Sequence, residues 1–206
     1  CYLEYKNINW DSIHTAYKHK VDNKSGYLEF YNLMADMLAE LKDGHVNLYT
    51  GFAVSSYKKW YSDYPANFSS DLLYSERYLG NKHYSVSGLR YGKISNNIGY
   101  IYYSDFSNRF SDTNMSYIFN YFKDCKGLII DVRNNGGGYL DLSEQFASYF
   151  FDKETITGYM QHKTGEGPTD FSKPQEIKTP AHKSFQWQLP VVVLTNRMSY
   201  SATNAF

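Results

Sequence analysis

Cysteine is scarce in this sequence, with only Cys1 and Cys125 among 206 residues. Two cysteines so far apart form neither a disulfide framework nor the closely spaced ligand pairs of a zinc site. No H-E-x-x-H motif is present, and five of the six histidines are scattered without ligand spacing: His14, His19, His83, His162 and His182. We therefore expect no metal and no cofactor. Cys125 borders an apolar segment and is expected to be a packed core thiol.

An excess of one charge is also missing, because 21 Lys and Arg residues are balanced by 21 Asp and Glu residues. This balance gives no indication of a nucleic-acid partner or of binding to an anionic membrane. No apolar run approaches the roughly 18 residues that a transmembrane helix needs. We therefore expect that the chain does not span a membrane.

The sequence starts at Cys1, without an initiating Met and without a signal peptide. We expect a mature or trimmed product whose targeting segment lies outside these residues. A lipidated Cys1 is an alternative, although the residues that follow it look like the inside of a domain rather than a linker.

Aromatic residues are abundant, with 22 Tyr and 13 Phe. Tyrosine packs well on half-buried strand faces, which is the simpler interpretation. An accessible aromatic cleft for peptides is the alternative. A chain of 206 residues can bury a sizeable core, so its length favours one domain or slightly more.

Two apolar segments without helical period, residues 128–132 and 191–195, predict buried strands. The first is followed by three glycines, which let a backbone turn sharply and whose amides can face a developing negative charge. The second is followed by the small polar residues 199–204, which suit a helix start. A serine at such a turn suits a nucleophile. Taken alone, an ordinary glycine turn and an N-cap serine are the simpler interpretations.

Together these segments resemble a known family, the C-terminal processing proteases and their relatives of the tricorn protease core. That family carries D-x-R-x-N-x-G-G after one strand and S-x-S-A-S after a later one. Residues 131–138 read DVRNNGGG and residues 199–203 read SYSAT. Residues 41–46, LKDGHV, are similar to the L-x-D-G-H segment of the tricorn-like branch. The three motifs occur in the family's order.

The resemblance implies an α/β fold, with a small N-terminal helical unit followed by a crotonase/ClpP-like α/β peptidase core that is incomplete at its C-terminus. We expect a helical unit at residues 1–50, a loop-rich aromatic insertion at 51–90 and the partial peptidase core at 91–206. Some family members insert a PDZ domain near residues 52–88, but this segment is too short for one, so none is expected.

Periodicity and turn signals predict the individual elements. A first helix is expected with Asp11 as its N-cap. Further helices are expected at residues 27–42, 112–123 and 140–151. Strands are expected at residues 155–162 and 185–188, and a hairpin at 91–94 and 98–103. Residues 52–88 and 164–183 are expected to form loops. The order of the later elements predicts parallel neighbours in the sheet.

The resemblance implies catalytic roles for Ser201 and His45. Ser201 is followed by Ala202 and a small residue, as the reactive serine of the family is, and a serine needs a base to become nucleophilic. Processing proteases use a downstream lysine, which these residues do not contain, whereas the tricorn branch uses a histidine that His45 matches. Imidazole suits a general base. A helix-end histidine bonded to a carbonyl is the alternative for His45.

The resemblance also implies the oxyanion donors, one amide of the glycine triplet and the amide after the serine, for which we expect Gly137 and Ala202. Asp131 and Arg133 are expected to hold the glycine turn through charge-assisted hydrogen bonds.

The resemblance implies a serine endopeptidase that acts outside the cytoplasm on unfolded chains or protein C-termini through an acyl-enzyme on Ser201. The alternative is an inactive relative that binds peptides or glycans through the same cleft. We expect the partner to be a peptide or an unfolded protein; the sequence does not predict an oligomeric state. The 206-residue chain alone is expected to be inactive, because residues that complete the site and the sheet are expected beyond Phe206.

Overall fold

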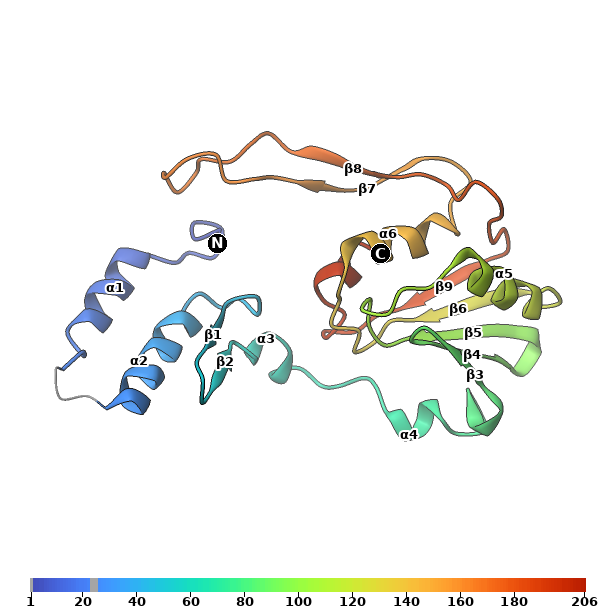
Figure 1. The fold of residues 1–206 in the computed structure, drawn as a ribbon, viewed down its shortest axis with the longest axis horizontal. Coiled ribbons are helices and arrows are strands. Elements are labelled where there is room, and N and C mark those ends of the chain that lie inside the picture. The colour runs from blue at the N-terminus through green and yellow to red at the C-terminus, as the bar shows by residue number, and fades with distance from the viewer. Residues whose placement is uncertain (1, 23–25) are drawn as a thin grey trace. The chain divides into compact units, whose positions relative to one another are not determined.

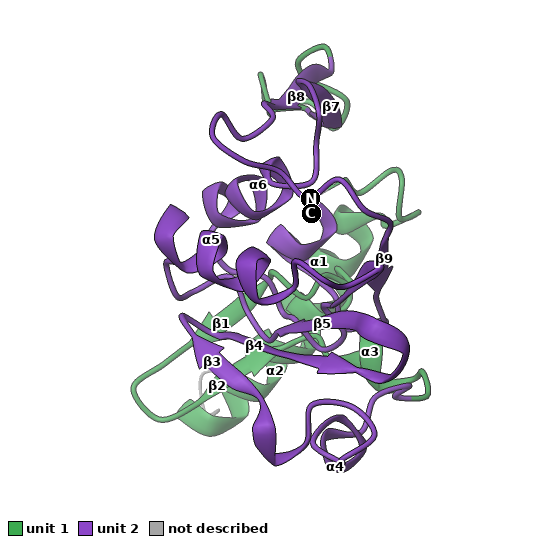
Figure 2. Ribbon diagram, turned by 90° about the vertical axis from the view of Figure 1, so that its right-hand side faces the viewer, with its two compact units in different colours: residues 1–65, 161–173 green, residues 66–160, 174–206 purple. Residues whose placement is uncertain are grey.

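The computed structural model describes residues 2–22 and 26–206. Cys1, with the alternative of its lipidation, and residues 23–25 lie outside the described residues. The chain forms two compact units, one of residues 1–65 and 161–173 and the other of residues 66–160 and 174–206 (Figure 2). The domain boundaries expected from the sequence divide the chain differently and stay a prediction.

The first unit begins with two helices, α1 (Trp10–Lys18) and α2 (Tyr27–Ala39). Asn9 caps α1, because its side chain accepts the Ser12 amide at 2.9 Å, so the expected N-cap at Asp11 is wrong by two positions. The loop expected from residue 52 contains a strand instead: β1 (Asn47–Tyr49) pairs antiparallel with β2 (Val54–Ser56), and α3 (Lys59–Ser62) follows.

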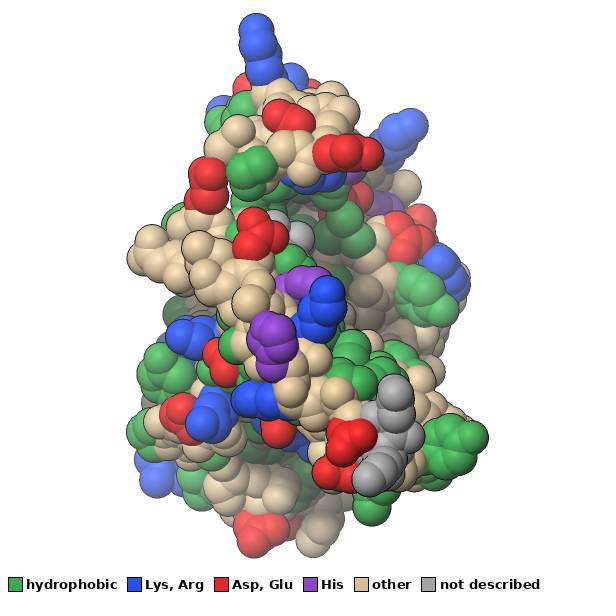
Figure 3. Space-filling model, turned by 90° about the vertical axis from the view of Figure 1, so that its left-hand side faces the viewer, with side chains coloured by type: hydrophobic (Ala, Val, Ile, Leu, Met, Phe, Trp, Pro, Cys, Tyr) green, Lys and Arg blue, Asp and Glu red, His purple; other side chains and the backbone are tan. Residues whose placement is uncertain are grey.

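Few side chains are buried in the first unit. Among its described hydrophobic residues, only Tyr31 and Leu41 lie in the buried class. The segment at residues 161–173 packs on the N-terminal residues, where the rings of Tyr2 and Phe171 stack with centroids 4.6 Å apart. Lysine and arginine side chains alternate with acidic ones on the face that Figure 3 shows, in keeping with the balanced composition.

The second unit is built on a five-stranded sheet in the order β3-β4-β5-β6-β9 (Figure 1). The strands are β3 (Tyr84–Val86), β4 (Leu89–Ile94), β5 (Ile98–Tyr103), β6 (Gly127–Asp131) and β9 (Val191–Leu194). The first three are antiparallel, and β5, β6 and β9 are parallel. The mixed α/β fold, the hairpin and the parallel neighbours expected from the sequence are therefore confirmed.

Side-chain alternation along the strands gives the sheet two buried faces. Leu128 and Ile130 of β6 enter a core that also contains residues of α5 (Asp112–Tyr121) and α6 (Leu140–Ser148). Ile129 points to the opposite face, where a smaller cluster forms around Tyr100. Each fully buried aliphatic or aromatic side chain stabilises the fold by about 1.5–3 kcal/mol, so the larger cluster is the main stabilising element.

Two short helices precede β3 in the second unit: α4 (Ser70–Leu73) and the 3₁₀ helix η1 (Gly80–Lys82). Ser69 caps α4, because its hydroxyl accepts the Leu72 amide at 3.2 Å. Leu73 and Leu79 belong to the smaller cluster, so this segment covers part of the sheet face opposite α5 and α6. Residues 52–88 are thus less irregular than expected.

A long ribbon departs from the expectation for residues 155–188. β7 (Thr155–Met160) pairs antiparallel with β8 (Gln175–Thr179), although β8 lies inside a segment expected to be a loop. Polar residues dominate β8, so backbone pairing rather than an apolar pattern defines it. The strand expected at residues 185–188 is wrong: this segment is irregular, and Trp187 packs into the core while its amide donates to Tyr149 O at 2.8 Å.

Within residues 2–22 and 26–206, no helix combines the length and the apolar character needed to cross a bilayer.

Candidate active site

The two loops that carry the sequence motifs follow neighbouring strands. β6 and β9 are parallel, and Asp131 is paired with Leu194 at their carboxyl ends. The loops that leave such ends lie at the same edge of a sheet, which is where α/β folds bind ligands. Asn134 and Asn196 join the two loops: the Asn134 amide donates to Asn196 Oδ1 at 2.9 Å, and Asn196 Nδ2 donates to Asn134 Oδ1 at 2.6 Å.

Ser201 opens a 3₁₀ turn, η3 (Ser201–Asn204), rather than an α-helix. Its φ is +58°, in the left-handed region that residues other than glycine rarely adopt. Such strain costs about 1–3 kcal/mol and occurs at functional sites, including the nucleophile turns of hydrolases. The Ser201 side chain is partly exposed, and its hydroxyl makes no hydrogen bond to any residue that the structure describes.

Ser199 differs from Ser201 in that its hydroxyl is committed to the backbone. It donates to Val132 O at 2.8 Å and accepts from the Asn196 amide at 3.0 Å. The side chain is buried, at 9% exposure. Ser199 therefore ties the turn after β9 to the end of β6, and its hydroxyl is not available for chemistry.

The glycine loop lies directly against this turn. Gly137 has φ +93°, and a Cβ placed on it would stand 2.7 Å from Ser201 Cβ and 2.9 Å from the Ala202 nitrogen. Gly138 has φ +143°, and a Cβ there would stand 2.4 Å from Phe106 O. Only glycine fits at these positions without displacing backbone. Gly136 is different, because a Cβ there would meet nothing within 4 Å.

The structure thus brings three of the expected site residues together: Ser201, Gly137 and Ala202. The Ala202 amide donates no hydrogen bond within the described residues. The Gly137 amide, in contrast, donates to Asn135 Oδ1 at 2.9 Å. Ala202 is therefore an open donor beside Ser201, whereas Gly137 would share its hydrogen with Asn135 if it also bound an oxyanion. Its neighbour Gly138 has an amide that donates to no described residue.

Two buried polar residues next to this loop, Asn135 and Thr203, had no role assigned from their motifs. They bond to each other, with Thr203 Oγ1 at 2.7 Å from Asn135 Oδ1. Asn135 stands in the D-x-R-x-N-x-G-G motif, but a motif letter alone does not show which loop a side chain will contact.

Asp131 and Arg133 hold the end of β6. Asp131 is fully buried and accepts from Arg133 Nε at 2.9 Å, from Arg133 Nη2 at 2.7 Å and from the Tyr100 hydroxyl at 2.5 Å. Burial, and then the hydrogen bond to Asp131, raise the pKa of Tyr100 above its usual value. The Arg133 amide also donates to Asp131 Oδ1 at 3.0 Å, which turns the chain toward the glycines.

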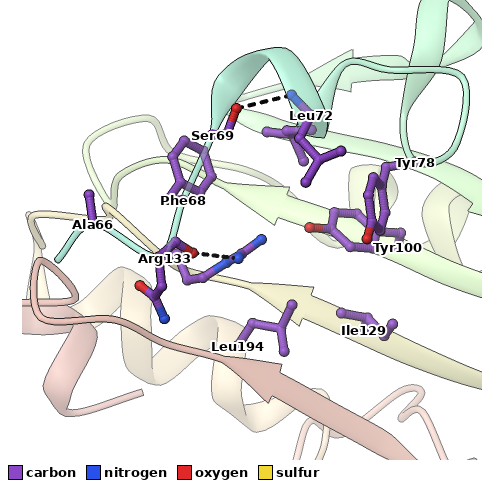
Figure 4. Close-up of a pocket in the computed structure, with 11 residues that line it drawn as sticks. Ala66, Phe68, Ser69, Leu72, Tyr78, Tyr100, Ile129, Arg133 and Leu194 are labelled. Carbon is purple, nitrogen blue, oxygen red and sulfur yellow. Dashed lines mark hydrogen bonds between the residues drawn. The ribbon is translucent and has the colours of Figure 1, made fainter.

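A pocket of about 470 Å³ opens beside Arg133 on the sheet face opposite α5 and α6 (Figure 4). Arg133 Nη1 donates to Asn67 O at 2.8 Å, and the guanidinium lies 5.3 Å from the Phe68 ring centre. The remaining wall is mostly apolar, with Leu72, Leu73, Tyr78, Tyr100, Ile129 and Leu194.

His45 lies in the first unit, after α2 and before β1. Its side chain is 59% exposed, and Nδ1 stands 3.6 Å from Asp43 Oδ1, which also accepts the His45 amide at 3.0 Å. Burial works to raise the pKa of Asp43, but hydrogen bonds from Lys6 and the His45 amide, together with the Lys6 charge, hold it below its usual value. The pairing of His45 with Ser201 would join the two units and stays a prediction.

No cluster of three or more His, Cys, Asp or Glu side chains suited to a metal ion occurs in the part of the chain that the structure describes.

Two models of known protein families match this chain. The sequence model of peptidase family S41 matches residues 97–206, and that of the tricorn protease C1 domain matches residues 1–39. A crystal structure of a candidate peptidase from Parabacteroides merdae is 41% identical, with a TM-score of 0.93. The match covers 100% of this chain, which spans 65% of the length of that protein.

Two more distant structures also match. A photosystem II D1 C-terminal processing protease is 18% identical, over 59% of this chain and 33% of that one, with a TM-score of 0.37. A lipoprotein from Streptococcus agalactiae is 14% identical, over 95% and 62% of the two chains, with a TM-score of 0.45.

Proposed function

The chain belongs to peptidase family S41, and from this premise we propose that it is a serine endopeptidase that forms an acyl-enzyme on Ser201. The observation that carries the proposal is the state of Ser201. Its backbone is held at φ +58°, its hydroxyl is unbonded within the described residues, and the open amide of Ala202 is the next one along the chain. Acyl transfer needs a nucleophile next to a hydrogen-bond donor that is free to stabilise the developing oxyanion.

In this mechanism the Ser201 Oγ attacks the carbonyl carbon of the scissile peptide bond. A general base takes the hydroxyl proton and then gives it to the leaving amine, while water later cleaves the acyl ester. The oxygen of the tetrahedral intermediate carries the negative charge, and the proposed donor to that oxygen is the Ala202 amide. A glycine amide from residues 136–138 supplies the second donor.

His45 is the proposed base. Support comes from its place in the tricorn-like motif and from its exposed imidazole, whose Nδ1 faces the Asp43 carboxylate at 3.6 Å. That carboxylate is held by Lys6 Nζ at 2.8 Å, so a negative charge is fixed on one side of the ring. A carboxylate in this place stabilises an imidazolium that forms when the ring takes a proton.

The proposed substrates are unfolded chains or protein C-termini, and the proposed location is outside the cytoplasm. Both come from the family resemblance. Cell fractionation followed by immunodetection tests the location, and a cytoplasmic pool alone would contradict it.

Covalent labelling tests the nucleophile. The protein, expressed from its complete reading frame, is incubated with a fluorophosphonate, and the adduct is mapped by peptide mass spectrometry. We expect one adduct on Ser201, none in Ser201→Ala, and loss of casein cleavage in the same variant. An adduct on Ser199, or labelling that persists in Ser201→Ala, would contradict the assignment. A folded wild-type protein that is not labelled would favour the inactive, peptide-binding alternative.

A further inference from the structure

Asn135 joins three segments of the second unit, and its side chain has no exposed surface. Its Nδ2 donates to Tyr103 O at the end of β5, at 3.0 Å. Its Oδ1 accepts the Gly137 amide of the glycine loop at 2.9 Å. Its remaining contacts reach the turn that carries Ser201. A fully buried carboxamide with every polar atom bonded is a rigid element, because any displacement breaks a hydrogen bond away from water.

The contacts to the turn lie on both sides of Ser201. The Tyr200 amide donates to Asn135 O at 3.0 Å. The Thr203 hydroxyl stands 3.0 Å from the same carbonyl and 2.7 Å from Oδ1, and it donates its one hydrogen to this pair of acceptors. The residue before Ser201 and the second residue after it are therefore both tied to Asn135. A strained backbone persists only where the surrounding structure over-determines it.

The same oxygen couples the turn to the glycine loop. Asn135 Oδ1 accepts from both Thr203 and Gly137, and Gly137 is the residue that stands against Ser201 Cβ and the Ala202 nitrogen. A shift of Asn135 would move the nucleophile and the nearby donor relative to each other. Small displacements of this kind cost rate steeply, about a hundredfold for 1 Å.

We propose that Asn135 is the positioning residue of the active site, which holds Ser201 at its strained φ and fixes the Ala202 amide beside it. Asn135 acts through Tyr200, Thr203 and Gly137 and does not touch the substrate. The inference rests on the proposed function, since positioning has a measurable effect only where Ser201 reacts.

Substitutions at Thr203 distinguish the positioning role of Asn135 from a purely structural role. Thr203→Val removes the hydroxyl at nearly constant shape, while Asn135 O keeps the Tyr200 amide and Asn135 Oδ1 keeps the Gly137 amide. No buried acceptor is left unpaired, so the loss of stability is small. Thr203→Ser keeps the hydroxyl and loses only a methyl group, and it is the matched control. Asn120→Asp, on the exposed side of α5, controls for a substitution of asparagine elsewhere.

The experiment measures the second-order rate of fluorophosphonate labelling at Ser201 across pH, together with the melting temperature, in the protein from its complete reading frame. We expect Thr203→Val to be labelled about tenfold more slowly and Asn135→Ala at least about a hundredfold more slowly. Thr203→Ser should stay within about twofold of wild type, and Asn120→Asp should equal it. Neither Asn135→Ala nor Thr203→Val should move the midpoint of the pH profile, because neither removes a titrating group.

The outcomes separate the two proposals. If wild type is labelled on Ser201 and Thr203→Val is labelled equally fast, Asn135 is structural only and the inference is overturned, whatever the melting temperature does. If wild type is not labelled, the proposed function fails and the inference falls with it. If Asn135→Ala does not fold, the contrast between Thr203→Val and Thr203→Ser decides: slow labelling in the first and normal labelling in the second supports positioning.

Discussion

Gly137 lies directly against Ser201, although the two residues are 64 positions apart in the chain. A methyl group on Gly137 would stand 2.7 Å from Ser201 Cβ, closer than real Cβ atoms come to other heavy atoms. The glycine loop after β6 and the serine turn after β9 therefore form one unit. A change in either loop is transmitted to the other, and the predictions below use that relationship.

Gly137→Ala should disable the site, whereas Gly136→Ala should not. The Cβ of the first variant would lie 2.6 Å from Tyr200 O at φ +93°, so the serine turn has to move. Loss of one oxyanion donor or of its alignment costs about 3 kcal/mol, or a hundredfold in rate. The Cβ of the second variant meets nothing within 4 Å. Labelling rates and casein cleavage check this pair, and a normal rate in Gly137→Ala would move the oxyanion site elsewhere.

Ser199→Ala should lower stability and leave chemistry in place. The substitution leaves the Asn196 amide without its partner, whereas Val132 O keeps the Asn135 amide, and an unpaired amide away from water costs about 1–3 kcal/mol. Urea unfolding gives the stability and fluorophosphonate labelling gives the reactivity. Loss of labelling in a variant of wild-type stability is the result that would assign chemistry to Ser199.

His45→Gln should lose activity without losing stability. The imidazole is 59% exposed, so the unfolding free energy should change by less than about 0.5 kcal/mol. Removal of a general base lowers kcat by about 10²- to 10⁴-fold. His14→Gln, on the exposed surface of α1, is the control and should behave as wild type. A full rate in His45→Gln would transfer the role of base to another residue, with a downstream lysine the first candidate.

Acid should weaken the first unit through Asp43. The folded-state pKa of Asp43 is depressed, so its contribution to stability is present above the unfolded pKa of about 3.9 and is lost as pH falls through the lower folded value. Lys6→Met should remove about 1 kcal/mol near pH 7 and flatten the acid dependence below about pH 4.

The control for this pair is Lys178→Met, because Lys178 pairs with Glu176 at 3.0 Å with both side chains close to half exposed. It should change stability by less than about 0.5 kcal/mol at any pH. Thermal unfolding between pH 3 and pH 7 checks both variants. An unchanged acid dependence in Lys6→Met would remove Lys6 as the cause of the depressed pKa.

Local patterns in the sequence predict the strands and the motif loops well. The apolar segments at residues 128–132 and 191–195 form β6 and β9, because each carries its own strand pattern. β8 has no such pattern, since Gln175, Glu176 and Lys178 are polar and the strand exists through its pairing with β7. Elements of this kind depend on a partner that local periodicity cannot reveal.

The same limit applies to the site. The motifs predict that a serine and a glycine triplet meet, but the commitment of the Gly137 amide to Asn135 depends on how two loops pack. The left-handed φ of Ser201 is likewise imposed by tertiary contacts, because its sequence favours an ordinary helix start. The pairing of His45 with Ser201 stays a prediction.

The ribbon of β7 and β8 has a consequence for limited proteolysis. The strands of the ribbon belong to the second unit, but its tip, residues 161–173, belongs to the first, so the chain passes between the units three times. A protease cut between residues 65 and 66 would leave fragment 1–65 holding the tip through contacts such as the stack of Tyr2 on Phe171. The two fragments should therefore elute together on a sizing column and part only in denaturant, as two halves of a split protein do.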